Sequence, residues 1–130
     1  MKHSILIVDD DSDDIELTTL AIEQCSVDVD VQSVTTGTAA FELLRNGHTP
    51  PSLILLDLKM PGMSGLDFLR ELRADEHLKN IPVIIVTSSN LEADRQEVLK
   101  TGANDFLHKT FKMTQFCNEL EMLLERWLPN

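Results

Sequence analysis

The sequence predicts an α/β fold, in which a parallel sheet of five strands is covered by helices on both faces. Short apolar runs rich in Ile and Val alternate with segments of helical period, and five such repeats can be counted. The third run, Leu53–Leu56, is continuously apolar, as in a strand buried on both faces, and leads directly into Asp57. Because a buried strand excludes charge, Asp57 must lie where this strand leaves the core.

Length and composition indicate one soluble domain. The 130 residues, 42% apolar and 25% charged, are typical of a globular chain and argue against disorder. No run approaches the roughly 18 apolar residues of a membrane span, and the N-terminus lacks the features of a secretory signal, so we expect a cytoplasmic protein. The formal charge of −11 repels phosphate backbones and anionic lipids, so we expect neither nucleic acid nor a membrane as partner.

In the first half of the chain, acidic residues mark the start of a helix. The run Asp11–Asp14 suits its N-terminal turn, because carboxylates cap free amides at the positive end of the helix dipole. Gly47 can end the next helix. The elements predicted here are a strand over Ser4–Val8, a helix over Ile15–Ser26, a strand over Val31–Thr35 and a helix over Thr38–Arg45.

In the second half, two capping patterns mark helix starts: Ser64 with Asp67, and Ser89 with Glu92. The helix that Ser89 would open has few apolar residues, so we expect it to be loosely held. The elements predicted here are strands over Leu53–Leu56, Pro82–Val86 and Ala103–Leu107, and helices over Gly65–Ala74, from Ser89 to Lys100 and over Met113–Trp127.

Polar side chains follow four of the predicted strands. Asp9 and Asp10 follow the first, Asp57 the third, Thr87 the fourth and Lys109 the fifth. Because the carboxyl ends of parallel strands meet at one edge of the sheet, where ligands bind, we expect these groups to lie together. Taken alone, each residue could be only a helix cap, a strand residue or a surface charge. Because all of them are expected at one edge of the sheet, a ligand-binding site is the favoured interpretation.

Clustered carboxylates suit a hard divalent cation. They repel one another, and Mg²⁺ prefers oxygen ligands while keeping water molecules that a phosphate group can replace. With its charge screened, Asp57 can attack the phosphorus of a phosphodonor and form an aspartyl phosphate. Lys109 and Thr87 would then bind the phosphoryl oxygens.

Four segments resemble a known family: ILIVDDD, LILLDLKMPGMSGLDFLRELR, IPVIIVTSS and GANDFLHK. Together they are similar to the receiver domain of bacterial two-component response regulators, over essentially the whole chain. The resemblance implies a flavodoxin-like (CheY-like), doubly wound fold with strand order 2-1-3-4-5 and five helices. It also implies a single receiver domain over residues 1–130, with no output domain.

The resemblance further implies a signalling phosphoacceptor, not an enzyme with turnover beyond self-phosphorylation and slow autodephosphorylation. The implied partners are a sensor histidine kinase or phosphotransfer protein, and a downstream protein that reads the face of the fourth helix, fifth strand and fifth helix. A homodimer through that face is a further expectation, and DFLHKTF with the Trp-bearing last helix is most similar to stand-alone receivers associated with phytochrome or hybrid histidine kinases. The implied roles are Asp57 as phosphoacceptor, Asp9, Asp10, Asp57 and the backbone carbonyl of Lys59 as Mg²⁺ ligands, Thr87 and Lys109 as phosphate-binding residues, and Thr87 and Phe106 as the switch.

One position departs from the family, which usually has proline, often after a cis bond, where this chain has Thr110. Since a non-proline cis bond costs about 2.5–4 kcal/mol, we expect the Lys109–Thr110 bond to be trans.

Three other functions were weighed against this interpretation. A phosphatase of the haloacid dehalogenase class needs a second acid two residues after its nucleophile, and here Lys59 occupies that position. A nucleotide- or flavin-binding module would need a glycine-rich phosphate loop, and the five glycines never form G-x-G. A receiver-like adaptor without phosphorylation would lack at least one core residue, and all are present.

Overall fold

The computed structural model describes residues 3–47, 49–88, 92–110 and 112–129, and none of the helices in these ranges is long and apolar enough to cross a membrane. Strands and helices alternate along the chain. In order, they are β1 (His3–Val8), α1 (Ser12–Glu23), β2 (Val29–Val34), α2 (Gly37–Asn46), β3 (Leu53–Asp57), α3 (Gly65–Ala74), β4 (Val83–Thr87), α4 (Glu92–Thr101), β5 (Asp105–His108) and α5 (Met113–Trp127).

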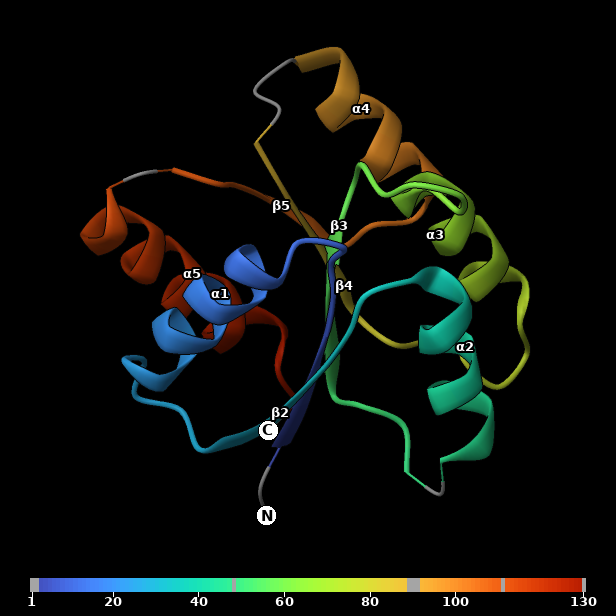
Figure 1. The fold of residues 1–130 in the computed structure, drawn as a ribbon, viewed down its shortest axis with the longest axis horizontal. Coiled ribbons are helices and arrows are strands. Elements are labelled where there is room, and N and C mark those ends of the chain that lie inside the picture. The colour runs from blue at the N-terminus through green and yellow to red at the C-terminus, as the bar shows by residue number, and fades with distance from the viewer. Residues whose placement is uncertain (1–2, 48, 89–91, 111, 130) are drawn as a thin grey trace.

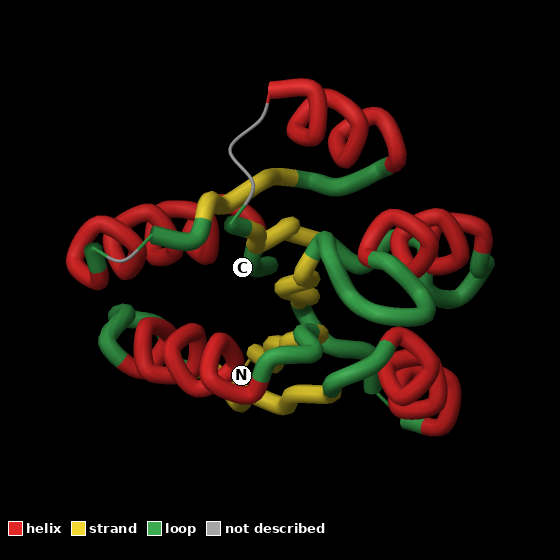
Figure 2. Tube along the Cα trace, turned by 45° about the horizontal axis from the view of Figure 1, so that its top comes forward, coloured by secondary structure: helices red, strands yellow, loops and turns green. Residues whose placement is uncertain are grey.

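The strands form one parallel sheet in the order β2-β1-β3-β4-β5. Helices α1 and α5 cover one face, while α2, α3 and α4 cover the other (Figures 1 and 2). The predicted fold class and strand order are therefore confirmed.

Two apolar clusters fill the space between the sheet and its helices. Successive residues of β3 alternate between them: Ile54 and Leu56 join the cluster beneath α2, α3 and α4, whereas Leu53 and Leu55 join the one beneath α1 and α5. Every residue of β3 is buried, which explains why this strand is continuously apolar up to Asp57.

Helix α1 begins earlier than predicted, at Ser12 in place of Ile15, and it ends at Glu23 in place of Ser26. A carboxylate oxygen of Asp11 accepts hydrogen bonds from the backbone N–H groups of Asp13 (2.9 Å) and Asp14 (3.4 Å). Asp11 is therefore the cap itself, and the acids that follow it form the first turn.

Edge strand β2 runs over Val29–Val34 and not over Val31–Thr35, because its half-buried residues mark the ends of a strand weakly. Helix α3 has the predicted bounds, with the reciprocal cap between Ser64 and Asp67 in place. The predicted cap at Ser89 lies outside the described residues.

Helix α4 has few apolar anchors, as predicted. Among its described side chains, from Asp94 to Thr101, only Val98 is buried, and Leu99 is 39% exposed. Little apolar area therefore holds the described part of this helix, from Asp94 to Thr101, to the sheet.

Arg73, near the end of α3, forms hydrogen bonds with residues at the ends of several other elements. Its guanidinium donates to the carbonyl oxygens of Gly102 (2.9 Å), Ile81 (2.7 Å) and Lys79 (2.9 Å), and to the side-chain oxygen of Asn104 (2.9 Å). Gly102 follows α4, Ile81 precedes β4 and Asn104 precedes β5. Arg73 thus fixes the C-terminal end of α4 against the sheet.

We predict that Arg73→Met lowers the free energy of unfolding by about 3 kcal/mol, because it leaves several partly buried oxygens without their charged donor. Urea denaturation measures the change. The control is Arg70→Met in the same helix, whose ion pairs with Asp67 and Glu97 are exposed and whose loss should cost no more than about 0.5 kcal/mol. Equal losses for the two variants would contradict this role of Arg73.

Candidate functional site

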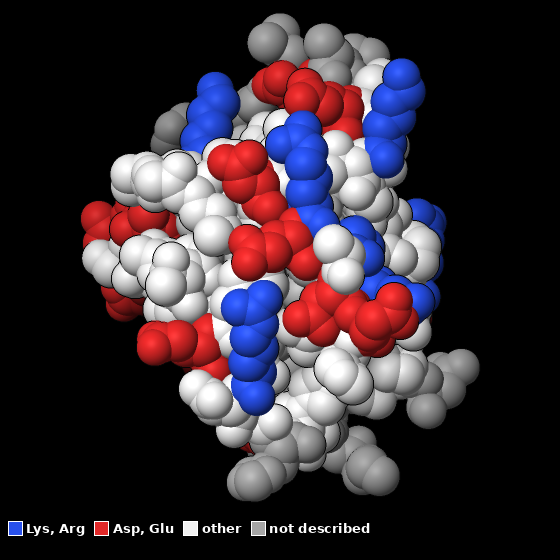
Figure 3. All heavy atoms as spheres, turned by 90° about the vertical axis from the view of Figure 1, so that its right-hand side faces the viewer, with Lys and Arg blue, Asp and Glu red and all other residues white. Residues whose placement is uncertain are grey.

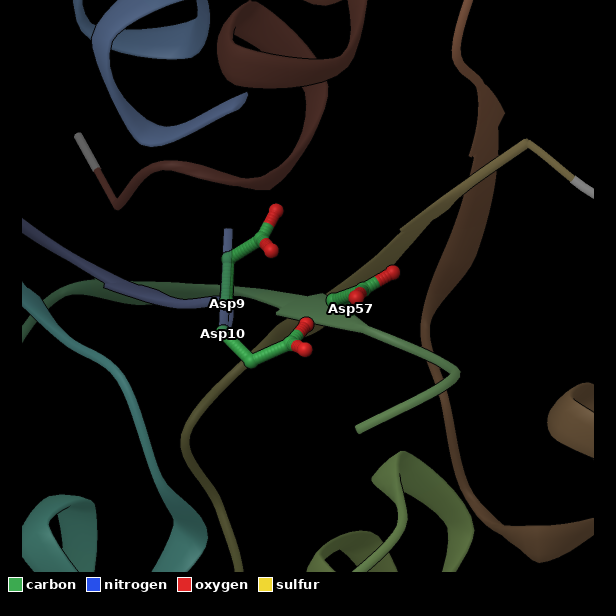
Figure 4. Close-up of side chains that lie close together, drawn as sticks. All are labelled: Asp9, Asp10 and Asp57. Atoms are coloured by element: carbon green, nitrogen blue, oxygen red, sulfur yellow. The ribbon is translucent and has the colours of Figure 1, made fainter. Parts of the chain in front are cut away.

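Strand register places two aspartates side by side at the edge of the sheet. Val8 of β1 pairs with Leu56 of β3, so the residues that follow, Asp9 and Asp57, lie at the same level. Both are almost fully buried, with exposed fractions of 4% and 8%. Carboxylate oxygens of Asp9, Asp57 and the exposed Asp10 lie within 4.8 Å of one another, and Figure 4 shows the three side chains grouped beyond the strand ends.

The neighbouring strands bring a hydroxyl and an ammonium group to the same edge. Asp57 pairs with Val86, so the next residue of β4, the buried Thr87, lies just beyond it. Thr87 pairs with His108 of β5, and the backbone N–H of Lys109 donates to the carbonyl of Thr87 (2.7 Å). The predicted gathering of strand-end residues is therefore present.

The ammonium group of Lys109 contacts three carboxylates. Its Nζ lies 2.8 Å from Oδ2 of Asp14, 3.1 Å from Oδ2 of Asp9 and 3.4 Å from Oδ1 of Asp57. Asp9 also accepts a hydrogen bond from the backbone N–H of Asp11 (3.0 Å). The ammonium therefore links the acids of the strand ends to the first turn of α1.

Burial and repulsion shift the pKa values of these groups. Burial raises the pKa of Asp57 to about 6, and the charges of Asp9 and Asp10 add to this rise, while Lys109 opposes it. Burial also raises the pKa of Asp9, against the stabilising contacts of Asp11 and Lys109. For Lys109, burial favours the neutral amine, but the carboxylates of Asp14, Asp57 and Asp9 outweigh it and raise its pKa.

Acidic residues of α1 lie close to the strand-end carboxylates. Helix α1 contains four acidic residues and no basic one, next to the acids that end β1. On the face of α2, α3 and α4, basic side chains lie among acidic ones (Figure 3), and ion pairs join Arg45 to Glu71 and Arg70 to Glu97. Helix α1 therefore adds negative charge next to the site.

The residues at the strand ends fit a hard divalent cation. Mg²⁺ binds oxygen ligands at about 2.1 Å, so two oxygens in its first shell lie about 3–4 Å apart. The oxygens of Asp9, Asp10 and Asp57 are already within a similar distance. Three carboxylates against one ammonium group leave an excess of negative charge for a cation to neutralise.

A backbone hydrogen bond closes the loop that leaves β3. The backbone N–H of Gly65 donates to the carbonyl of Leu58 (2.9 Å), and a Cβ atom at Gly65 would overlap the carbonyl oxygen of Asp57. Gly62, within the loop, has a φ of +77°. Lys59 lies on this loop with an exposed side chain, and the predicted use of its carbonyl as a ligand stays a prediction.

Phe106, predicted as a switch residue, lies on β5. Its half-buried side chain packs against the cluster beneath α2, α3 and α4, and the guanidinium carbon of Arg95 in α4 lies 5.9 Å from its ring centre. Phe106 is thus placed between the sheet and α4, and its predicted role in switching stays a prediction.

The sequence interpretation missed one contact of the site. It assigned Asp14 only to the first turn of α1, whereas the structure pairs it with Lys109. The available signal was helix periodicity, because Asp14 lies one turn before Thr18, which belongs to the buried face of α1. The described residues contain no cis peptide bond, so the Lys109–Thr110 bond is trans, as expected.

Comparison with known proteins relates the whole chain to one family. Residues 5–121 match the family described as the response regulator receiver domain. The DNA-binding response regulator MtrA of Mycobacterium tuberculosis H37Rv is 34% identical over 126 residues, which cover 97% of this chain and 52% of MtrA. The chain thus spans about half the length of such relatives.

Two solved structures match over nearly their full length. The phosphorylated cyanobacterial phytochrome response regulator RcpA superposes with a TM-score of 0.88 at 29% identity, covering 100% of both chains. The receiver domain of the sensor histidine kinase PA1611 of Pseudomonas aeruginosa, with a magnesium ion in its active-site cleft, has a TM-score of 0.80 at 29% identity and covers 98% of both chains.

We predict that Asp57→Asn stabilises the cation-free protein at pH 7.5 by about 2 kcal/mol, measured by urea denaturation with EDTA. The pKa of Asp57 is about 6 in the fold against 3.8 for an ordinary aspartate, so its ionised form disfavours folding. The folded state takes up the proton first as the pH falls, and the difference between variant and wild type should therefore shrink below pH ~6 and vanish near pH ~4.

The control for this titration is Asp13→Asn, which removes an exposed carboxylate from the first turn of α1. At pH 7.5 it should not stabilise the protein, because Asp13 lies at the positive end of the helix dipole. A difference for Asp57→Asn that stays constant from pH 7.5 to pH ~4 would contradict the raised pKa of Asp57.

Proposed function

Because the chain belongs to the family of response regulator receiver domains, we propose that it is the phosphoacceptor of a two-component phosphorelay. Asp57 takes the phosphoryl group from a phosphohistidine of a sensor histidine kinase or phosphotransfer protein. The observation that carries this proposal is the contact of the nearly buried Asp57 with Lys109, beside two further carboxylates that fit a cation. The phosphorylated state in which RcpA was solved supports it.

In the proposed reaction, a carboxylate oxygen of Asp57 forms a bond to phosphorus while the bond from phosphorus to the donor nitrogen breaks. The electron pair stays on that nitrogen, and the imidazole gains a proton from solvent. Lys109 pairs with the phosphoryl oxygens, and the hydroxyl of Thr87 donates a hydrogen bond to them. Both groups lie at the strand ends beside Asp57, which supports these roles.

Mg²⁺ would be held by Asp9, Asp10, Asp57 and the carbonyl of Lys59, and it would neutralise negative charge and accept a phosphoryl oxygen in place of a water molecule. The magnesium ion in the PA1611 receiver supports this choice of cation. Lys59 stands where a phosphatase would carry an acid for its leaving group, so we propose a signalling protein without turnover of phosphate esters.

The phosphoryl group would act on the surface formed by α4, β5 and α5. It adds about two negative charges beside Thr87, at the end of β4 and before α4. The single buried anchor described in α4, Val98, and the packing of Phe106 near Arg95 support a change in this region. A downstream protein, or a second copy of the chain, would bind there.

We predict that acetyl phosphate with Mg²⁺ adds about 80 Da to the protein, at an acyl linkage that base and hydroxylamine cleave. Intact-mass spectrometry measures the adduct, which Asp57→Asn should abolish. Asp13→Asn, a substitution of the same kind at an exposed position, should retain it. No adduct on the wild type, or an undiminished adduct on Asp57→Asn, would refute the proposed function.

A second prediction concerns the cation. Asp10→Ala should weaken Mg²⁺ binding about tenfold or more, because it removes one of the three clustered carboxylates. Asp13→Ala removes the same charge from the nearby helix turn and should change the affinity about twofold at most. Isothermal titration calorimetry distinguishes the two, and similar losses would show that general charge, not the cluster, binds the cation.

A further inference from the structure

The shortest contact of Lys109 is to a carboxylate outside the proposed cation site. Its Nζ lies 2.8 Å from Asp14 but 3.4 Å from Asp57. Bonds between an ammonium group and a carboxylate are strongest at about 2.7–2.9 Å. In the cation-free protein, the best hydrogen bond of Lys109 is therefore made to α1 and not to the proposed phosphoacceptor.

The fold holds Asp14 in this position. Asp11 caps the turn and accepts a hydrogen bond from the backbone N–H of Asp14 (3.4 Å), and Thr18, one turn further along, is buried. These contacts fix both the start of α1 and its rotation about its own axis. The Asp14 side chain therefore faces the ammonium group because of the helix that carries it, and not by a chance surface approach.

We propose that Asp14 is a positioning residue that draws the ammonium group of Lys109 toward α1 and so opposes the phosphorylated state of Asp57. This inference rests on the proposed function. A phosphoryl group on Asp57 would compete with Asp14 for the ammonium group of Lys109. The carboxylate of Asp14 also repels the added negative charge. Competition for Lys109 and direct repulsion therefore both disfavour the phosphorylated state.

The surroundings of the pair leave room for this exchange. Asp14 and Lys109 line a cavity of about 350 Å³ together with Thr18 and Phe116. Once Lys109 turns toward a phosphoryl group, the Asp14 side chain can rotate into this space. The exchange therefore needs no movement of α1.

The test is Asp14→Asn, which removes the charge and keeps the shape of the side chain. Beryllium trifluoride, an anion that mimics a phosphoryl group on aspartate, is titrated at saturating Mg²⁺ and followed by fluorine-19 NMR. We expect Asp14→Asn to bind it about tenfold more tightly than wild type. The matched control, Asp13→Asn, loses the same charge in the same helical turn without a described contact to Lys109, and should bind within about twofold of wild type.

A second pair of variants tests whether Asp14 acts through the lysine. In a Lys109→Met background, the gain from Asp14→Asn should fall well below tenfold, to the part that comes from direct repulsion between Asp14 and the bound anion. An equal gain with and without Lys109 would overturn the positioning role, as would unchanged or weaker binding by Asp14→Asn in the wild-type background.

Failure of this inference differs from failure of the proposed function. If the wild type binds the anion and gains its adduct at Asp57, but Asp14→Asn behaves like Asp13→Asn, only the role of Asp14 is refuted. If the wild type neither binds the anion nor gains an adduct, the proposed function is refuted and the role of Asp14 with it.

Discussion

The site depends on one constraint: strand register forces carboxylates together at a place where they cannot separate. Asp9 and Asp57 follow paired residues of two adjacent strands, and the apolar clusters on both faces of the sheet hold these strands in place. Repulsion between the acids therefore cannot be relieved by movement, and it adds to the rise that burial causes in the pKa of Asp57. Lys109 reduces the repulsion, and a cation or a proton can reduce it further.

The fold could be predicted almost completely because its signals are local. The apolar run before Asp57 can only be a strand covered on both faces, and the cap of Ser64 with Asp67 fixes the start of α3. Where the signals are weak, the boundaries were wrong: edge strand β2 has few buried residues to mark its ends. The contacts of Arg73 were not predicted, because they join carbonyl groups whose proximity only the tertiary structure creates.

The site was predictable where a strand end determines position, as for Asp9, Asp57 and Lys109. Asp14 was missed because an acid in the first turn of a helix already has a sufficient explanation in the helix dipole. Its contact with Lys109 depends on the rotation of α1 about its axis, which the burial of Thr18 fixes in three dimensions. The carboxylate of Asp14 can thus stabilise the start of α1 and contact Lys109 at the same time.

The anchors of α4 determine where a change at the site can act. Val98 is buried near the C-terminal end of the helix, and Arg73 holds the carbonyl of Gly102 just beyond it. Thr87 lies on the strand that leads into the opposite end of the same helix. If Thr87 moves on the proposed phosphorylation, the change would reach α4 at the end away from these anchors. The sheet around the acids would then stay rigid, while the added charge would alter the position of α4.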